Sequence, residues 1–181
     1  MSTGQDIERI NRMNFRSALN ALAYPGRLHR VTPLFDSGLL ALASVLLYAE
    51  VTYHYQGGRD IHLIEALTGT RSADAVAADY LFSDGESPEL LAQARVGTQD
   101  SPEFGATLVI DCLAGTRSIK TVLTGPGIDG SRRRELPLSR ELLEDLEEKN
   151  SGFPLGVDCF LLVGSDGLIG LPRTTRIEVL S

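Results

Sequence analysis

Two groups of polar residues stand at the ends of an apolar stretch near the C-terminus, and their chemistry suits anion binding. Arg173, Thr174 and Thr175 follow a proline and bring a guanidinium and two hydroxyls together. Such a set can bind phosphate or carboxylate. Asp158 is the one charge in the predicted strand 157–163, and a buried carboxylate is costly unless it is paired. Arg173 could therefore hold a ligand or form an internal ion pair with Asp158, and the sequence leaves both roles open.

The turn Gly125-Pro126-Gly127 is a second candidate, because it directly follows a predicted strand. Successive backbone N–H groups in a turn of this kind can bind an anion. The turn lacks the Gly-Lys-Ser/Thr ending that completes a phosphate-binding loop. A turn without a ligand is therefore favoured over a binding loop.

No complete catalytic set stands around these residues in the sequence. Asp158 has no histidine or second carboxylate close to it that would complete an acid–base pair. Cys112 and Cys159 lie in apolar runs and are expected to be buried, reduced thiols. The three histidines are scattered and lack metal-ligand spacing. We therefore assign no catalytic residue and expect neither a metal nor a cofactor.

A predicted β-hairpin positions the polar groups at its two ends. Residues 157–163 are apolar at both parities apart from Asp158, which is typical of a strand covered on both faces. Residues 164–167 read Gly-Ser-Asp-Gly, a turn sequence, and residues 168–171 form the predicted return strand. Asp158 and Arg173 are thus expected to mark the ends of the hairpin.

Helices and strands are interleaved along the chain, which predicts an α/β fold with a mixed β-sheet and flanking helices in a single domain, 1–181. Predicted helices cover 6–22, 39–50 and 139–150, and further predicted strands cover 51–56, 77–82, 106–113, 118–124 and 176–180. The composition of 83–105 shifts towards Gly, Ser and Pro. We interpret this segment as a surface excursion within the domain, with one helix near 88–95.

The N-terminal helix, within residues 1–24, is amphipathic. Its apolar face is expected to be buried and holds Ile7, Ile10, Phe15, Ala18, Ala21 and Leu22. The polar face holds Arg9, Arg12, Arg16 and Asn20.

The charge of the chain argues against some classes of function. Its formal net charge is −7, whereas nucleic-acid surfaces depend on clustered Lys and Arg. The run 132–134 consists of three arginines between acidic neighbours, which favours a solvated loop or a rim contact to an acidic partner over nucleic-acid binding. No stretch reaches the ~20 apolar residues of a membrane helix, and the polar N-terminus does not resemble a signal peptide. We expect a cytoplasmic protein that binds neither nucleic acid nor membrane.

Six segments resemble a bacterial protein family in their order and spacing. They are Phe15-Arg16, Pro25-Gly26, Gly-Ala-Thr-Leu (105–108), Leu-Thr-Gly-Pro-Gly-Ile (123–128), Phe-Pro-Leu-Gly-Val-Asp (153–158) and Leu-Pro-Arg-Thr-Thr (171–175). On these motifs the chain resembles PhnH, the H subunit of the bacterial carbon–phosphorus lyase core complex. The resemblance covers nearly the whole chain and is weakest over 59–102.

This resemblance implies a role in organic phosphonate catabolism. It implies a homodimer that works with the G, I and J subunits of the core complex. Together these subunits would form ribose 1-methylphosphonate 5-triphosphate from ATP and methylphosphonate. The missing catalytic set agrees with a protein that is not catalytic on its own and that helps to assemble the complex or to shape its substrate site. The alternative is a stand-alone enzyme or sensor that binds phosphonate or phosphate.

The resemblance also implies a reduced pyridoxal-phosphate-transferase-like fold without the cofactor. Pyridoxal phosphate needs a Schiff-base lysine, and the chain has only Lys120 and Lys149, neither of them in a persuasive position. The cofactor is therefore not expected. Eight residues are candidates for binding a ligand or a partner: Arg16, Gly125, Pro126, Gly127, Asp158, Arg173, Thr174 and Thr175.

Overall fold

The computed structural model describes residues 4–112 and 117–180, and the statements on structure below concern these residues. The α-helices are α1 (Gly4–Ala23), α2 (Gly38–Leu46), α3 (His62–Thr68), α4 (Pro88–Gln93) and α5 (Arg140–Lys149), and a 3₁₀-helix, η1, spans Pro102–Phe104. The strands are β1 (His29–Arg30), β2 (Thr52–Gln56), β3 (Arg71–Ser72), β4 (Tyr80–Asp84), β5 (Thr107–Cys112), β6 (Ile119–Thr124), β7 (Arg132–Leu136), β8 (Asp158–Val163), β9 (Gly167–Leu171) and β10 (Arg176–Val179).

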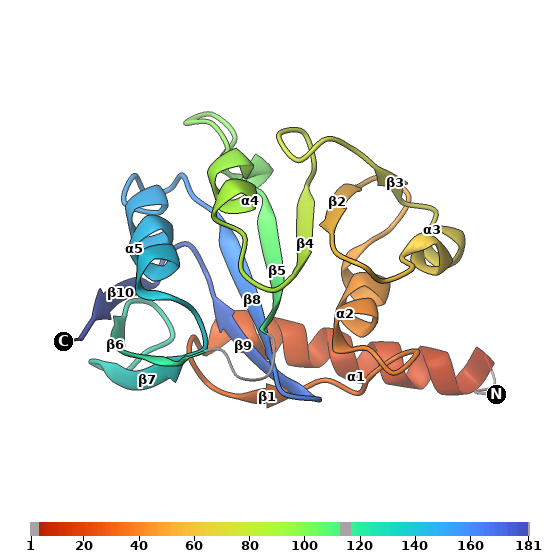
Figure 1. The fold of residues 1–181 in the computed structure, drawn as a ribbon, viewed down its shortest axis with the longest axis horizontal. Coiled ribbons are helices and arrows are strands. Elements are labelled where there is room, and N and C mark those ends of the chain that lie inside the picture. Colours follow the sequence, from red (N-terminus) through yellow and green to blue (C-terminus); the bar gives the residue numbers. More distant parts are fainter. Residues whose placement is uncertain (1–3, 113–116, 181) are drawn as a thin grey trace.

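The main sheet has seven strands in the order β1-β9-β8-β5-β4-β2-β3, with β4, β5 and β8 near its centre (Figure 1). The strands from β8 to β3 are parallel to one another, whereas β9 and β1 extend the sheet in antiparallel fashion. A second, antiparallel sheet has the order β10-β6-β7. The predicted mixed β-sheet with flanking helices is confirmed.

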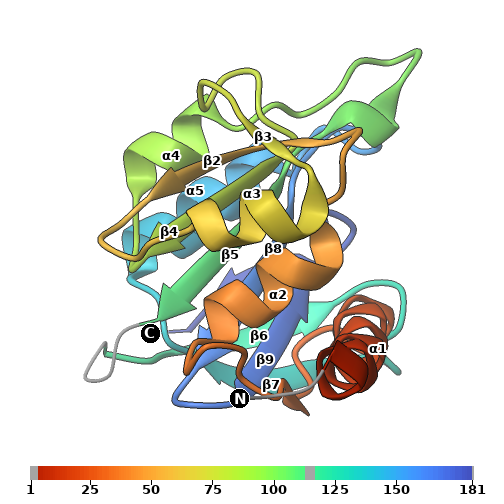
Figure 2. The ribbon, with the colours of Figure 1, turned by 90° about the vertical axis from the view of Figure 1, so that its right-hand side faces the viewer.

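Two layers cover the main sheet, one on each face. Helices α1, α2 and α3 pack on one face, and α4, α5 and the small sheet pack on the other, as Figures 1 and 2 show together. Neighbouring residues of each central strand point to opposite layers. In β4, for example, Phe82 faces the first layer and Leu81 faces the second. Both faces of the main sheet carry apolar side chains because each face is covered by one of the two layers.

The β8–β9 hairpin forms where the sequence predicts it. Cys159 pairs with Leu171 at one end and Val163 pairs with Gly167 next to the turn. Every residue of β9 is buried, and so are the four central residues of β8. The apolar run at both parities is therefore explained by the two layers that cover this hairpin, one on each face.

The helix α1 differs from the prediction in one side chain. Phe15, which we expected on the buried face, is 47% exposed. The buried face is instead centred near Asn14, whose side-chain amide accepts a hydrogen bond from the Thr32 N–H (2.8 Å) and donates one to the Thr32 carbonyl (2.9 Å). Asn14, a polar residue whose side-chain amide is hydrogen-bonded, is therefore buried, whereas the phenylalanine that the helical wheel placed on the buried face is exposed.

The arginine run 132–134 also differs from the prediction, because it lies in strand β7 and not in a solvated loop. Its backbone pairs with β6, and the buried Leu136 anchors the end of the strand. Arg132 donates a hydrogen bond to the carbonyl of Pro25. Side chains of a β-strand point alternately to its two sides. Arg132 and Arg134 therefore lie on the half-buried side of β7, and Arg133 lies on the side that faces solvent.

Side-chain caps fix the starts of three helices. Ser37 precedes α2 and accepts a hydrogen bond from the Leu40 N–H (3.2 Å). Ser87 and Ser139 cap α4 and α5 in the same way. Within the segment 83–105, α4 buries Leu90 and Leu91 in the core.

None of the helices formed by residues 4–112 and 117–180 has the length and apolar composition needed to cross a membrane.

Candidate functional site

The two ends of the β8–β9 hairpin meet in an ion pair. Arg173 Nη2 lies 2.8 Å from Asp158 Oδ2, and the Arg173 backbone N–H and Nε donate to Asp158 Oδ1 at 2.8 and 3.3 Å. Arg173 Nη1 donates to the carbonyl of Pro102 at 2.6 Å. The side chains are only 15% and 22% exposed, respectively. The internal ion pair that the sequence left open is therefore present: two nitrogens of the guanidinium bind Asp158, and the third binds the Pro102 carbonyl.

Glycines pack closely around Arg173. A Cβ atom at Gly105 would lie 2.5 Å from Arg173 Nη1, and one at Gly156 would lie 3.1 Å from Arg173 Cβ. Gly156 also has a φ of +147°, a conformation that favours glycine. Beside it, the buried Asn150 donates to the Val157 carbonyl (3.1 Å) and accepts from the Val157 N–H (2.8 Å). The motifs at 105–108, 153–158 and 171–175 thus form one packed unit.

The turn Gly125-Pro126-Gly127 packs against the chain after β9. A Cβ atom at Gly125 would lie 2.6 Å from the carbonyl oxygen of Thr174. Thr175 is buried, its N–H donates to the Pro172 carbonyl (2.8 Å), and its hydroxyl has no hydrogen-bond partner among the residues described. The structure therefore brings this turn and the segment 173–175 together.

Arg16 lies apart from the other predicted residues. It is exposed on α1, as Arg12 and Met13 are. Arg12 forms a surface ion pair with Glu8 (3.1 Å). The other seven candidates belong to the hairpin ends or to the turn 125–127, whose Gly125 packs against Thr174, whereas Arg16 belongs to the outer face of the N-terminal helix.

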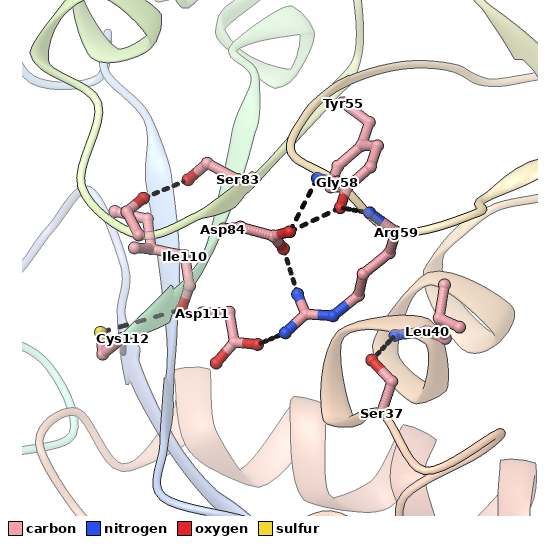
Figure 3. Close-up of polar contacts among 11 residues, drawn as sticks. Ser37, Leu40, Tyr55, Gly58, Arg59, Ser83, Asp84, Ile110, Asp111 and Cys112 are labelled. Atoms are coloured by element: carbon pink, nitrogen blue, oxygen red, sulfur yellow. Dashed lines mark hydrogen bonds and ion pairs between the residues drawn. The ribbon is translucent and has the colours of Figure 1, made fainter. Parts of the chain in front are cut away.

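A second polar group, which the sequence did not reveal, lies at the carboxyl ends of the parallel strands. Arg59 extends from the loop after β2 and forms ion pairs with Asp84, at the end of β4, and Asp111, near the end of β5 (Figure 3). The distance from Arg59 Nη2 to Asp111 Oδ2 is 2.5 Å. The hydroxyl of Tyr55 donates to Asp84 Oδ2 (2.8 Å) and accepts from the Arg59 N–H (2.7 Å). We call these four residues the carboxyl-edge cluster.

The carboxyl-edge cluster lies where the connections of the sheet reverse direction. Helix α3 leads from β2 to β3 on one face of the sheet, whereas α4 leads from β4 to β5 on the opposite face. Open α/β sheets often bind ligands in a crevice at the carboxyl ends of strands at such a reversal. Here a cavity of about 280 Å³ is bordered by Arg59, Asp111 and the start of α2 at Ser37.

The chemistry of the carboxyl-edge cluster suits hydrogen bonding more than phosphate binding. One guanidinium faces two carboxylates, so the formal charge of the cluster is negative and disfavours a phosphate dianion. Burial raises the pKa of Tyr55, and Asp84 adds to the rise against an opposing hydrogen bond from the Arg59 backbone. The tyrosine hydroxyl therefore stays protonated and donates to Asp84.

The two cysteines are poor nucleophiles in this fold. Burial raises the pKa of Cys112 to about 12 and also raises the pKa of Cys159. A thiol that keeps its proton is unreactive, because the thiolate is the nucleophile. Among residues 4–112 and 117–180, no group of three or more His, Cys, Asp or Glu side chains could hold a metal ion.

We predict that Arg59→Ala lowers the free energy of unfolding by about 1–2 kcal/mol, between the values for exposed and buried ion pairs. The reason is that Asp84 and Asp111, each less than a quarter exposed, would lose their shared counterion. Urea unfolding followed by circular dichroism measures the change. Arg71→Ala is the matched control, because Arg71 is exposed on the edge strand β3. Equal effects of the two substitutions would show that the cluster does not stabilise the fold.

Comparison with known proteins adds to this geometry. Residues 5–178 match the family described as bacterial phosphonate metabolism protein (PhnH). The chain is also 31% identical, over 170 residues, to the putative C-P lyase subunit protein HtxG of Stutzerimonas stutzeri, and the match covers 91% of this chain and 84% of that relative. The family match spans every motif on which the resemblance rested, from the first helix to the last strands. The chain therefore belongs to the PhnH family of bacterial phosphonate metabolism proteins.

Proposed function

We propose that the chain is a subunit of a carbon–phosphorus lyase complex that acts in phosphonate catabolism. The observation that carries this proposal is the match of residues 5–178 to the PhnH family. The similarity to a relative described as a putative C-P lyase subunit supports the same role. Because both similarities extend over most of the chain, they support a common role for the whole domain and not for one motif.

The finer proposal is a cytoplasmic homodimer that is non-catalytic alone. It would join the G, I and J subunits and support the formation of ribose 1-methylphosphonate 5-triphosphate from ATP and methylphosphonate. A reduced pyridoxal-phosphate-transferase-like fold without the cofactor is part of this proposal. The proposal of a subunit that is non-catalytic alone is supported by the state of its reactive side chains. Arg59 and Arg173 bind carboxylates of their own chain, and both thiols are buried.

A stand-alone phosphonate- or phosphate-binding enzyme or sensor is the second candidate. It is supported by the packing of the turn at Gly125 against Thr174, because both segments could contribute to one anion site. Against it stands the bonding of Arg173, whose guanidinium is shared between Asp158 and the Pro102 carbonyl. We therefore rank the complex subunit first.

Coexpression tests this ranking. The tagged chain is expressed with the G, I and J subunits from the same bacterium, and the purified material is sized and its stoichiometry measured. We expect a stable assembly that contains all four proteins, and we expect deletion of this chain's gene to abolish growth on methylphosphonate as the sole phosphorus source.

The matched control is the same coexpression without this chain. If G, I and J form their complex while this chain elutes alone, and the deletion strain still grows on methylphosphonate, the subunit role is wrong. Stabilisation of the isolated chain by millimolar methylphosphonate, measured as a rise in melting temperature, would then favour the stand-alone role.

A further inference from the structure

A cavity of about 380 Å³ opens at the amino ends of β4, β5 and β8, at the opposite end of the parallel strands from the carboxyl-edge cluster. We call it the amino-edge cavity. Its lining includes Asp79 and Asp158 from the strand starts, Tyr48 and Glu50 from the loop after α2, and Phe104 from η1. Five separate stretches of chain therefore surround it.

The floor of the amino-edge cavity is electrically neutral and fixed. Asp158 is paired with Arg173, and Asp79 Oδ1 is paired with Arg95 at 2.5 Å. Asp79 Oδ2 also accepts hydrogen bonds from the N–H (2.7 Å) and the hydroxyl (2.8 Å) of Thr52. Because each of the two carboxylates has its own guanidinium, neither contributes an unbalanced charge to a ligand.

The rim, in contrast, carries negative charge that is not balanced. Glu50 and Glu103 are both exposed and both line the cavity. Neither forms an ion pair with any residue in 4–112 or 117–180. The rim therefore has a formal charge of −2 above a neutral floor, and it attracts cations and repels phosphate.

Aromatic side chains form the walls of the same cavity. Tyr48 is 52% exposed and Phe104 is 59% exposed, which leaves much of each ring open to solvent beside the rim carboxylates. Tyr80 lines the cavity more deeply. Burial raises the pKa of Tyr80, and the nearby Tyr48, Asp79 and Asp158 raise it further, so its hydroxyl stays protonated.

From this combination we propose that the amino-edge cavity binds a small organic cation, in which an ammonium or guanidinium group is carried on an apolar body. Aromatic faces attract such a cation through the negative charge of their π systems, and the carboxylates of Glu50 and Glu103 supply charge-assisted contacts. Neither feature alone would select this ligand: the carboxylates would accept any cation, and the rings would accept any apolar group. This binding goes beyond the proposed role in phosphonate catabolism and does not depend on it.

The test compares a cation with its neutral isostere. The full chain is titrated at low salt with choline and with 3,3-dimethyl-1-butanol, which has the same shape but no charge, and binding is followed by calorimetry and by NMR. We expect millimolar binding of choline and roughly tenfold weaker binding of the alcohol, because the loss of the charge removes both the cation–π and the carboxylate contributions.

Variants locate the site. Glu50→Gln/Glu103→Gln is expected to weaken choline binding roughly threefold to tenfold, and Tyr48→Leu/Phe104→Leu by a similar factor. All four positions are exposed, so the fold should persist, and circular dichroism checks this. The matched control is Glu141→Gln/Glu144→Gln on the exposed side of α5, which removes the same charge away from the cavity and should leave the affinity unchanged.

A second titration distinguishes two sources of the cationic group. A hexapeptide with one arginine among glycines presents the same chemistry as a side chain of another protein. Binding of choline identifies a free small cation, and binding of the peptide alone identifies a side chain. The proposal is overturned if neither probe binds, if choline and the alcohol bind equally, or if the α5 control weakens binding as much as the rim variant.

Discussion

Arg173→Ala is expected to lower the free energy of unfolding by about 3 kcal/mol, the lower end of the cost of breaking a buried ion pair. Asp158 would keep its bond from the residue 173 backbone N–H but would lose both side-chain partners. The Pro102 carbonyl would lose its bond from Arg173 and keep only the one from the Gly105 N–H (3.1 Å). Because the side chains of Arg173 and Asp158 are 15% and 22% exposed, water can replace these bonds only in part.

Urea unfolding provides the measurement, and two further variants make it decisive. Arg12→Ala removes an exposed ion pair with Glu8 and should cost less than about 0.5 kcal/mol. Asp158→Asn/Arg173→Ala should be less unstable than the sum of its single substitutions, because no buried charge is then left without a partner.

The opposite outcome would change the role of Arg173. If Arg173→Ala is as stable as Arg12→Ala but no longer supports growth on methylphosphonate, the guanidinium serves a ligand or a partner subunit and not the fold. The comparison thus separates the two roles that the sequence left open. An effect on growth together with strong destabilisation would instead follow from the loss of folded protein.

The hairpin could be predicted because its signals are local. Residues 157–163 show the double apolar parity of a doubly covered strand, and the turn 164–167 fixes where the chain reverses. Once the hairpin is assumed, its two ends must be neighbours, so a contact between Asp158 and Arg173 follows. Local pattern and chain reversal together were sufficient for this part of the site.

The carboxyl-edge cluster could not be predicted in the same way. Asp84 and Asp111 become neighbours only because β4 and β5 pair in parallel with those two residues in register. Parallel pairing depends on a crossover through α4, and no local motif encodes its register. Arg59 comes from yet another loop, within the segment that resembled the family least. The only available signal was an aspartate near the end of each of two predicted strands.

The face of α1 shows a limit of the helical wheel. The wheel places Phe15 at the margin of the apolar stripe, but the sheet beneath decides which residues are covered. Asn14 is buried there because its amide bonds both the N–H and the carbonyl of Thr32. A hydropathy scale takes no account of such a hydrogen bond. The predicted buried face is therefore shifted from Asn14 towards the larger, apolar Phe15.

Gly170→Ala is expected to lower the free energy of unfolding by about 2–4 kcal/mol, as overpacking does when backbone must move. A Cβ atom at Gly170 would overlap the carbonyl oxygen of Ala21 and lie 2.5 Å from the Ala21 carbonyl carbon and 2.9 Å from the Leu22 nitrogen. These are backbone atoms of α1, which cannot rotate away as a side chain could. The helix would therefore have to shift from β9, on which it packs.

Urea unfolding combined with amide hydrogen exchange tests this expectation, with Gly152→Ala as the matched control. A Cβ atom at Gly152 would meet no atom within 4 Å, and its φ is not in the left-handed region, so this substitution should change stability by less than about 1 kcal/mol.

In Gly170→Ala the amides of α1 should lose protection first, while those of β5 and β8 keep theirs, because the clash lies only at the α1 layer. Uniform loss of protection across the sheet would contradict a local cause, and wild-type stability would mean that α1 does not pack on β9 as closely as the structure shows. The close approach of a helix backbone to a strand glycine is thus what makes the C-terminal hairpin and the N-terminal helix one structural unit.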